Sequence, residues 1–196
     1  KMIAGHGRES ALLTHGVDLD FWQPTENSAS EETAAGSHRH GSTGPLAVFW
    51  GVVDPRLDTP MLTELSRRMP DGTIVLPGPQ QDPHDAIVEL PNVRAIGPQP
   101  FAELPKIAQA ADVLIMPYAD LPVTRAMQPL KMKEYIATGR PVVTSNLPAV
   151  QEWRDCMDVT ATPTEFADAV LRRISEGIPD SQASARERLR HEGWAA

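Results

Sequence analysis

The sequence contains few of the residues on which several classes of protein depend. Cys156 is the only cysteine among 196 residues, so an internal disulfide is impossible and a reducing compartment is favoured. Aromatic residues make up only 5% of the chain, which predicts a core of aliphatic side chains. No apolar run approaches the roughly 18 residues of a membrane span, and residues 1–10 lack the apolar stretch of a signal peptide. We therefore expect a soluble cytoplasmic domain, cut from a longer chain.

Positive charge is also scarce. The chain has 18 lysines and arginines against 26 acidic residues, which gives a formal net charge of -8. A nucleic-acid-binding protein needs a basic face to replace the counterions of the phosphate backbone, so we expect no nucleic-acid partner. No polybasic segment is present that would hold the chain on an anionic membrane. A phosphate ligand would therefore have to be held by local geometry.

Several catalytic motifs are missing. The sequence has neither the P-loop pattern nor the G-x-S-x-G elbow of α/β-hydrolases. "GHGRES" at 5–10 begins like a dinucleotide fingerprint, but it follows no strand and lacks the third glycine. "HRH" at 38–40 has no cysteine or carboxylate near it to complete a metal site. We expect no metal and no cofactor.

What the sequence does contain is an alternation of apolar strands and amphipathic helices. Short unbroken apolar strands between helices are typical of a parallel sheet covered on both faces. The fold class predicted is therefore α/β, a Rossmann-like doubly wound domain. Strands are predicted at 46–53, 72–78, 92–97, 112–118, 140–145 and 158–161, and helices at 57–69, 82–90, 101–110, 129–138 and 162–177, with a helical turn at 148–153.

The helix predicted at 129–138 is the most informative element. Pro129 at the first helical position needs no N–H partner, and the amides of Leu130 and Lys131 would point out of the helix start, where anions bind. Lys131 and Glu134 share one face. A cation suits phosphate, and a carboxylate accepts from ribose hydroxyls. The alternative from the residues alone is an ordinary solvated ion pair on an amphipathic helix.

Three segments together resemble a known family. "TRAMQPLKMKEYIATGRPVVTSNLPAV" (124–150) is similar to the donor-side signature of the retaining GT-B glycosyltransferases of the group 1, or family 4-like, type. "HGVDLDFWQP" (15–24) resembles the segment by which such enzymes enter their C-terminal domain. "NVRAIGPQPFAELPKIAQAADVLIMPY" (92–118) resembles a third stretch of the same family. The order of the three segments is also that of the family.

The resemblance implies a C-terminal half of a GT-B enzyme, with a cleft shared with an N-terminal acceptor domain that this chain lacks. Residues 1–24 would be the interdomain entry segment, and 45–180 the domain that binds a UDP- or GDP-sugar. Residues 25–44 are predicted to be a flexible low-complexity loop, and 181–196 a helix that crosses to the missing domain. Peripheral membrane contact would belong to the missing domain, and no catalytic residue is assigned here.

The site residues are carried over by position. Lys131 matches the lysine that binds diphosphate in the family, and the amide of Leu130 matches its phosphate cradle. Glu134 matches the second glutamate of the E-x7-E motif, which binds ribose, whereas the first glutamate is replaced by Ala126. The base is expected near the loop at 97–100, mostly against backbone. The donor-binding set predicted is Lys131, Glu134, Leu130, Pro129, Gln128, Arg125, Thr124, Gly51, Gly97 and Gln99.

Two departures from the family keep other functions open. Many relatives carry a basic residue after the first strand, where this chain has Gly51, and Arg56 is the only nearby substitute. Gly78 would allow close approach of backbone to a ligand or serve as a simple turn glycine. The alternatives are a sugar-nucleotide 2-epimerase and a non-catalytic nucleotide-binding domain. The sequence does not fix the sugar, the base, the acceptor or the oligomeric state.

Overall fold

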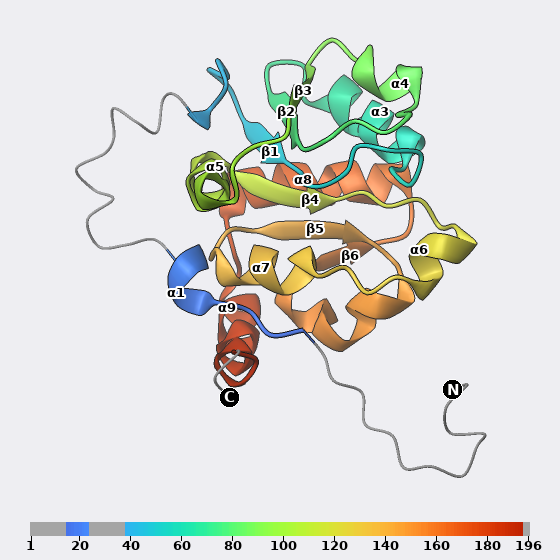
Figure 1. Ribbon diagram of the computed structural model, residues 1–196. Helices are drawn as coiled ribbons and strands as arrows, with labels where there is room; N and C mark the ends of the chain where they lie inside the picture. Colours follow the sequence, from blue (N-terminus) through green and yellow to red (C-terminus); the bar gives the residue numbers. More distant parts are fainter. Residues whose placement is uncertain (1–14, 24–37, 194–196) are drawn as a thin grey trace.

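The protein contains one parallel sheet with helices on both faces (Figure 1). The computed structural model describes residues 15–23 and 38–193. The six strands lie in the order β3-β2-β1-β4-β5-β6, and every neighbouring pair is parallel. This order is that of the classic dinucleotide-binding fold, so the prediction of a doubly wound sheet is confirmed. The strands are β1 (Leu46–Val48), β2 (Thr73–Pro77), β3 (Val93–Gly97), β4 (Val113–Met116), β5 (Val142–Ser145) and β6 (Asp158–Thr160).

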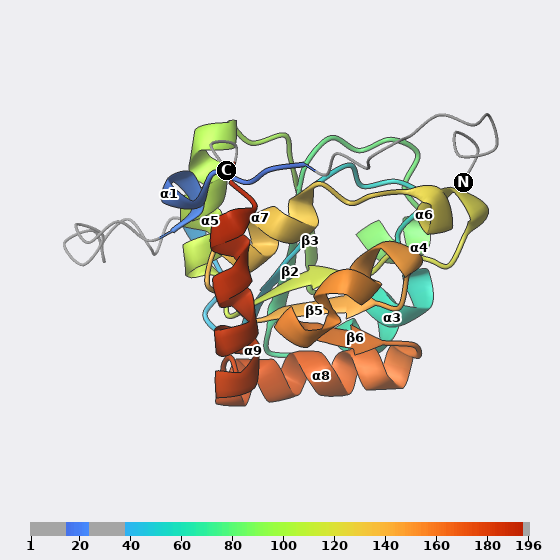
Figure 2. The same cartoon turned by 90° about the horizontal axis from the view of Figure 1, so that it is seen from below.

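The helices form a layer on each face of the sheet. Figure 2 shows α3 (Thr59–Arg68) and α8 (Pro163–Glu176) on one side and α5 (Leu104–Ala110) and α7 (Lys131–Ala137) on the other. The central strands are covered on both faces, which explains why they read as unbroken apolar runs rather than as alternating patterns. The other helices are α1 (Leu19–Trp22), α4 (Asp85–Val88), α6 (Pro122–Ala126) and α9 (Asp180–Arg186), with 3-10 segments at Phe101–Glu103, Pro148–Cys156 and Glu187–His191.

Local signals set the ends of the longer helices. Thr162 caps α8 by accepting from the Glu165 amide at 3.2 Å, and the Glu165 carboxylate accepts in return from the Thr162 amide. Gly177 ends the helix with φ +70°. The helix predicted at 162–177 is thereby confirmed, including its cap. In α3, Asp58 accepts from the Met61 amide at 2.9 Å and fixes the start in the same way.

Two predicted elements end or begin elsewhere. The strand predicted at 46–53 stops at Val48, and although the Gly51 amide still donates to the Pro77 carbonyl at 2.9 Å, the backbone of Gly51 turns to φ +145°. The helix predicted from Pro129 begins at Lys131. Pro129 lies just before it, in a tighter turn in which its carbonyl accepts from the Met132 amide at 3.0 Å. Pro129 is therefore not the first helical residue.

Segments outside the predicted elements are also ordered. Of the predicted loop 25–44, residues 25–37 lie outside the described residues, but Arg39 donates to the Ala110 carbonyl at 2.9 Å and pairs with Asp112 at 3.2 Å. The predicted helix at 181–196 is α9 followed by a 3-10 turn that ends at His191. Within the described residues, no helix has the length and apolarity to cross a bilayer.

Candidate functional site

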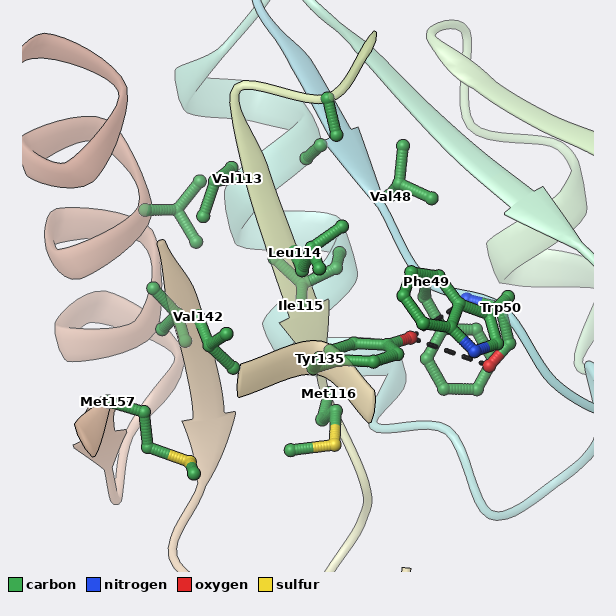
Figure 3. Close-up of a cluster of buried hydrophobic side chains, with 14 of the residues drawn as sticks. Val48, Phe49, Trp50, Val113, Leu114, Ile115, Met116, Tyr135, Val142 and Met157 are labelled. Atoms are coloured by element: carbon green, nitrogen blue, oxygen red, sulfur yellow. Dashed lines mark hydrogen bonds between the residues drawn. The ribbon is translucent and has the colours of Figure 1, made fainter. Parts of the chain in front are cut away.

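A buried tyrosine fixes α7 against the loop that follows β1. Tyr135 is fully buried, and its ring lies 3.9 Å from that of Trp50. Its hydroxyl accepts from the Trp50 amide at 2.8 Å, as Figure 3 shows, and donates weakly to the Trp50 carbonyl at 3.4 Å. Burial raises the pKa of Tyr135 well above its ordinary value, so this hydroxyl remains a neutral anchor. The first turns of α7 are thus held at the carboxyl end of β1.

Lys131, the first residue of α7, reaches into this loop. Its Nζ donates to the Trp50 carbonyl at 2.8 Å and lies 4.4 Å from the ring centroid of Phe49 and 5.5 Å from that of Tyr118. Burial, with repulsion from Arg56 as the next cause, lowers the pKa of Lys131 to about 8. Lys131 is therefore a partly desolvated cation held by a carbonyl and two aromatic faces.

Two glycines make room for this arrangement. A Cβ on Gly51 would lie 1.9 Å from Lys131 Nζ, so the ammonium takes the space that a side chain at position 51 would need. A Cβ on Gly78 would lie 1.8 Å from the Gly51 carbonyl oxygen. The loops after β1 and β2 can pack this closely only because residue 78 is glycine. Gly78 is thus required by the close approach of the two loops, and the expectation that it also admits a ligand stays a prediction.

Glu134 follows one turn later on α7 and lines a pocket. Its carboxylate accepts from the Trp50 indole N–H at 3.5 Å, and burial raises its pKa against the opposing effects of Trp50 and Lys131. The pocket has a volume of about 340 Å³. Its aromatic wall is built of Phe21, Trp22 and Phe101, where the rings of Phe21 and Phe101 stack at 4.8 Å. Glu134 is therefore a carboxylate at the edge of an aromatic pocket.

Arg56, the one nearby candidate to replace the missing basic residue, is already engaged. It forms an ion pair with Asp54 at 2.5 Å. Burial of Asp54 opposes its ionisation, but the hydrogen bonds and charge of Arg56 keep the pKa of this carboxyl below its ordinary value. The cation nearest to the space above Gly51 is Lys131 itself.

The predicted residues on α6 already have partners, and Leu130, just before α7, lines the same pocket as Glu134. Thr124 is fully buried, and its hydroxyl accepts from the Leu121 amide at 2.9 Å and donates to the Ala119 carbonyl. Arg125 forms an exposed ion pair with Asp120 at 2.5 Å. Gln128 is exposed and Leu130 is 54% exposed at the same edge of the sheet. A ligand would have to compete with Asp120 for Arg125.

The two remaining predicted residues lie at the end of β3 and in the loop that follows it. Gly97 has φ +73°, and its carbonyl accepts from the Gly78 amide at 2.8 Å. The Gln99 side-chain amide donates to the Ile96 carbonyl at 3.1 Å and to the Gly97 carbonyl at 3.3 Å. Gly97 and Gln99 thus shape a loop at the carboxyl edge of the sheet, to which Gly51 and Lys131 also belong.

Sequence reasoning missed the aromatic residues of the site. Trp22 and Trp50 stack at 5.3 Å, and Phe101 contacts Trp22 edge-on at 5.7 Å. Aromatic residues are scarce in this chain, so their appearance in "FW" at 21–22 and in "FW" at 49–50 was an available signal. Among the described residues, no three His, Cys, Asp or Glu side chains lie together as a metal site.

The strand order defines a doubly wound α/β domain, and comparison with known proteins gives the family. The family described as "Glycosyl transferases group 1" matches residues 60–176. The chain belongs to this family.

A curated relative is TuaH of Bacillus subtilis (strain 168), named for a glycosyltransferase of teichuronic acid biosynthesis. It is 33% identical over 151 residues, which are 74% of this chain and 37% of that protein. The chain thus spans well under half the length of this relative.

Solved structures support the fold. Anabaena HepE, determined in complex with UDP and glucose, superposes with a TM-score of 0.65 at 18% identity, covering 91% of this chain and 51% of that one. The C-terminal domain of the glycosyl transferase group 1 family protein LpcC from Francisella tularensis gives a TM-score of 0.58 at 16% identity. That match covers 92% of this chain and 95% of the LpcC domain. The fold is therefore that of the C-terminal half of a GT-B glycosyltransferase.

Proposed function

We propose that this chain is the donor-binding half of a glycosyltransferase, and that it binds a nucleoside-diphosphate sugar at the carboxyl edge of its sheet. The observation that carries the proposal is that Lys131 and Glu134 both lie on the first turns of α7, with the ammonium of Lys131 in the space beside Gly51. Membership of the group 1 family and the UDP complex of HepE support it. The acceptor would be bound by an N-terminal domain outside this chain, and the sugar and acceptor remain unassigned.

Lys131 is proposed to bind the diphosphate. Among residues 15–23 and 38–193 its ammonium is paired with a carbonyl and not with a carboxylate, so a phosphate oxygen would be a better partner than the one it has. Because residue 51 is glycine, no side chain at that position occupies the space beside the ammonium. Leu130, Pro129 and Gln128 would complete the cradle from the turn before α7.

Glu134 is proposed to accept hydrogen bonds from the ribose hydroxyls. It lies at the pocket lined by Phe21 and Phe101, whose flat rings suit the faces of a sugar or a base. The base is proposed to extend toward the loop containing Gly97 and Gln99. Thr124 and Arg125 are proposed to lie at the sugar end, with Arg125 released from Asp120 when donor binds.

The test is calorimetric titration of the 196-residue chain with UDP, GDP, ADP and NAD. We expect saturable binding of UDP or GDP, weakened in Lys131→Ala by about 1.5–3 kcal/mol, the usual contribution of a charged hydrogen bond. Lys106→Ala is the matched control, since Lys106 is exposed and pairs with Glu103 at 3.4 Å. Binding of NAD alone, or equal binding by Lys131→Ala and the parent, would contradict the proposal.

Activity separates transfer from the alternatives. The complete protein, with its N-terminal domain, should release free nucleoside diphosphate only when an acceptor is present. Interconversion of the donor without acceptor would indicate a 2-epimerase. Tight donor binding without either reaction would indicate a nucleotide-binding domain.

A further inference from the structure

A second cavity lies at the opposite edge of the sheet from the proposed donor site. It has a volume of about 630 Å³, within the range of about 300–1,000 Å³ typical of pockets for organic ligands. It lies between the end of α7, the start of β5 and α9, and both views show α9 beside the end of α7 (Figures 1 and 2). Its apolar wall includes Ile136, Pro141, Ile178 and Leu189.

Two arginines give this apolar cavity a positive charge. Arg140 donates to the Gln109 carbonyl, and Arg186 donates to the carbonyls of Arg140 at 2.8 Å and Cys156 at 2.9 Å. Within the described residues, neither guanidinium forms an ion pair with a carboxylate. Arg140 Nε and Arg186 Nη2 are also buried without a hydrogen-bond partner there. Such groups are costly to leave unsatisfied, and planar guanidinium groups match oxyanions well.

The surrounding charges leave the cavity positive. Arg190 also lines it and pairs with Glu187 at 3.0 Å, so that pair contributes no net charge. Burial lowers the pKa of Arg186 to about 10, opposed by the nearby Cys156 and Asp158, so the group stays charged at neutral pH. Asp112 stabilises the charge of Arg140, but it also pairs with Arg39. The two lining arginines remain without a carboxylate of their own.

We propose that this cavity binds a small organic molecule that carries one oxyanion group, a phosphate or carboxylate, on an apolar body. The oxyanion would contact Arg140 and Arg186, and the apolar body would lie against Ile136 and Leu189. A bare phosphate ion would leave most of the volume and the apolar wall unused. The site does not depend on the donor-binding function.

The experiment titrates the 196-residue chain with hexyl phosphate, hexanoate, inorganic phosphate and hexanol at constant ionic strength, followed by calorimetry. We expect saturable binding of hexyl phosphate or hexanoate, and binding at least about tenfold weaker for hexanol and inorganic phosphate. Three results would overturn the proposal. Hexanol could bind with the same affinity as the charged probes, inorganic phosphate could bind with the same affinity as hexyl phosphate, or no probe could show saturable binding.

Variants locate the binding. Arg186→Gln should weaken the charged probe by about tenfold or more, as for a lost charged hydrogen bond. Ala183→Trp is the second variant, in case Arg186→Gln fails to fold. It fills the cavity from the exposed side of α9 without removing an arginine, and it should abolish binding. Arg67→Gln on α3 is the charge-matched control and should bind as the parent does. Lys131→Ala should also bind normally, and loss of binding there would assign the probe to the donor site instead.

Discussion

The ammonium of Lys131 lies where a side chain on Gly51 would be, because a Cβ built on Gly51 would be 1.9 Å from Lys131 Nζ. Many members of the family that the sequence resembles carry a basic residue at this place after the first strand. In this chain position 51 is glycine, and the ammonium of Lys131, from α7, lies in the space that a side chain there would need.

Gly51→Ala should destabilise the protein by about 1–3 kcal/mol, because φ +145° is strained for a residue with a Cβ. Part of the cost should come from the clash with Lys131. The same substitution in a Lys131→Ala background should therefore cost at least about 0.5 kcal/mol less. Urea unfolding of the four proteins of this double-mutant cycle measures the coupling. Strict additivity would show that Lys131 does not occupy the space above Gly51.

The affinity for UDP should fall as the pH rises through the pKa of Lys131, about 8. At pH 7 the ammonium of the free protein is charged and ready for phosphate, whereas at pH 9 most molecules must first take up a proton. The expected loss between these values is about tenfold, since one pKa unit corresponds to about 1.4 kcal/mol. Calorimetry at both pH values, in buffers of different ionisation heat, measures the affinity and the proton uptake. Lys131→Ala should show a flat profile.

The same titration should appear in the stability of the unliganded protein. The unfolded chain keeps the lysine proton up to its ordinary pKa of 10.5, whereas the folded protein loses it near 8. The unfolded state therefore binds more protons between these values, and stability should rise with pH there. The difference in unfolding free energy between the parent and Lys131→Ala, followed from pH 7.5 to 10, isolates this contribution. A difference that stays constant would rule out a lowered pKa.

The sequence predicted the strands well because local chemistry decides them. Unbroken apolar runs such as β4, Val113–Met116, indicate strands buried on both faces, and caps such as Thr162 mark helix ends. The strand order was not predictable from these signals. It depends on which strands pair over long distances, and no residue-level pattern in the chain records that pairing.

Only the part of the site that depends on residues close together in the chain was predictable from the sequence. Lys131 and Glu134 lie three residues apart on one helix, so spacing alone brought them together. The contacts of Lys131 with Phe49 and the Trp50 carbonyl join positions about eighty apart in the chain, and the Phe21–Phe101 stack does the same. The fold creates these contacts, and with them the burial that lowers the pKa of Lys131.

Glu134→Ala should weaken binding of a nucleoside diphosphate by about 1.5–3 kcal/mol, the usual contribution of a hydrogen bond to a charged group. Pyrophosphate has no ribose hydroxyls, so its affinity should hardly change. Glu64→Ala is the control, because Glu64 lies on α3 and pairs with Arg67 at 2.8 Å on the other side of the sheet. Equal losses for the nucleotide and pyrophosphate would contradict the ribose assignment and leave the diphosphate assignment intact.

Gly78→Ala should be much more destabilising than Gly139→Ala. Both glycines have positive φ, +144° and +75°, so each substitution introduces backbone strain of about 1–3 kcal/mol. At Gly139 nothing lies within 4 Å of the added Cβ, whereas at Gly78 it would be 1.8 Å from the Gly51 carbonyl oxygen. Since that oxygen belongs to backbone, the loop after β1 must move, which adds about 1–3 kcal/mol of overpacking. Thermal and urea unfolding of both variants give the comparison. Gly78→Ala should also weaken UDP binding, because the displaced loop holds Trp50 and, through its carbonyl, Lys131. Equal stability of the two variants would show that the loops after β1 and β2 are not in contact at Gly78.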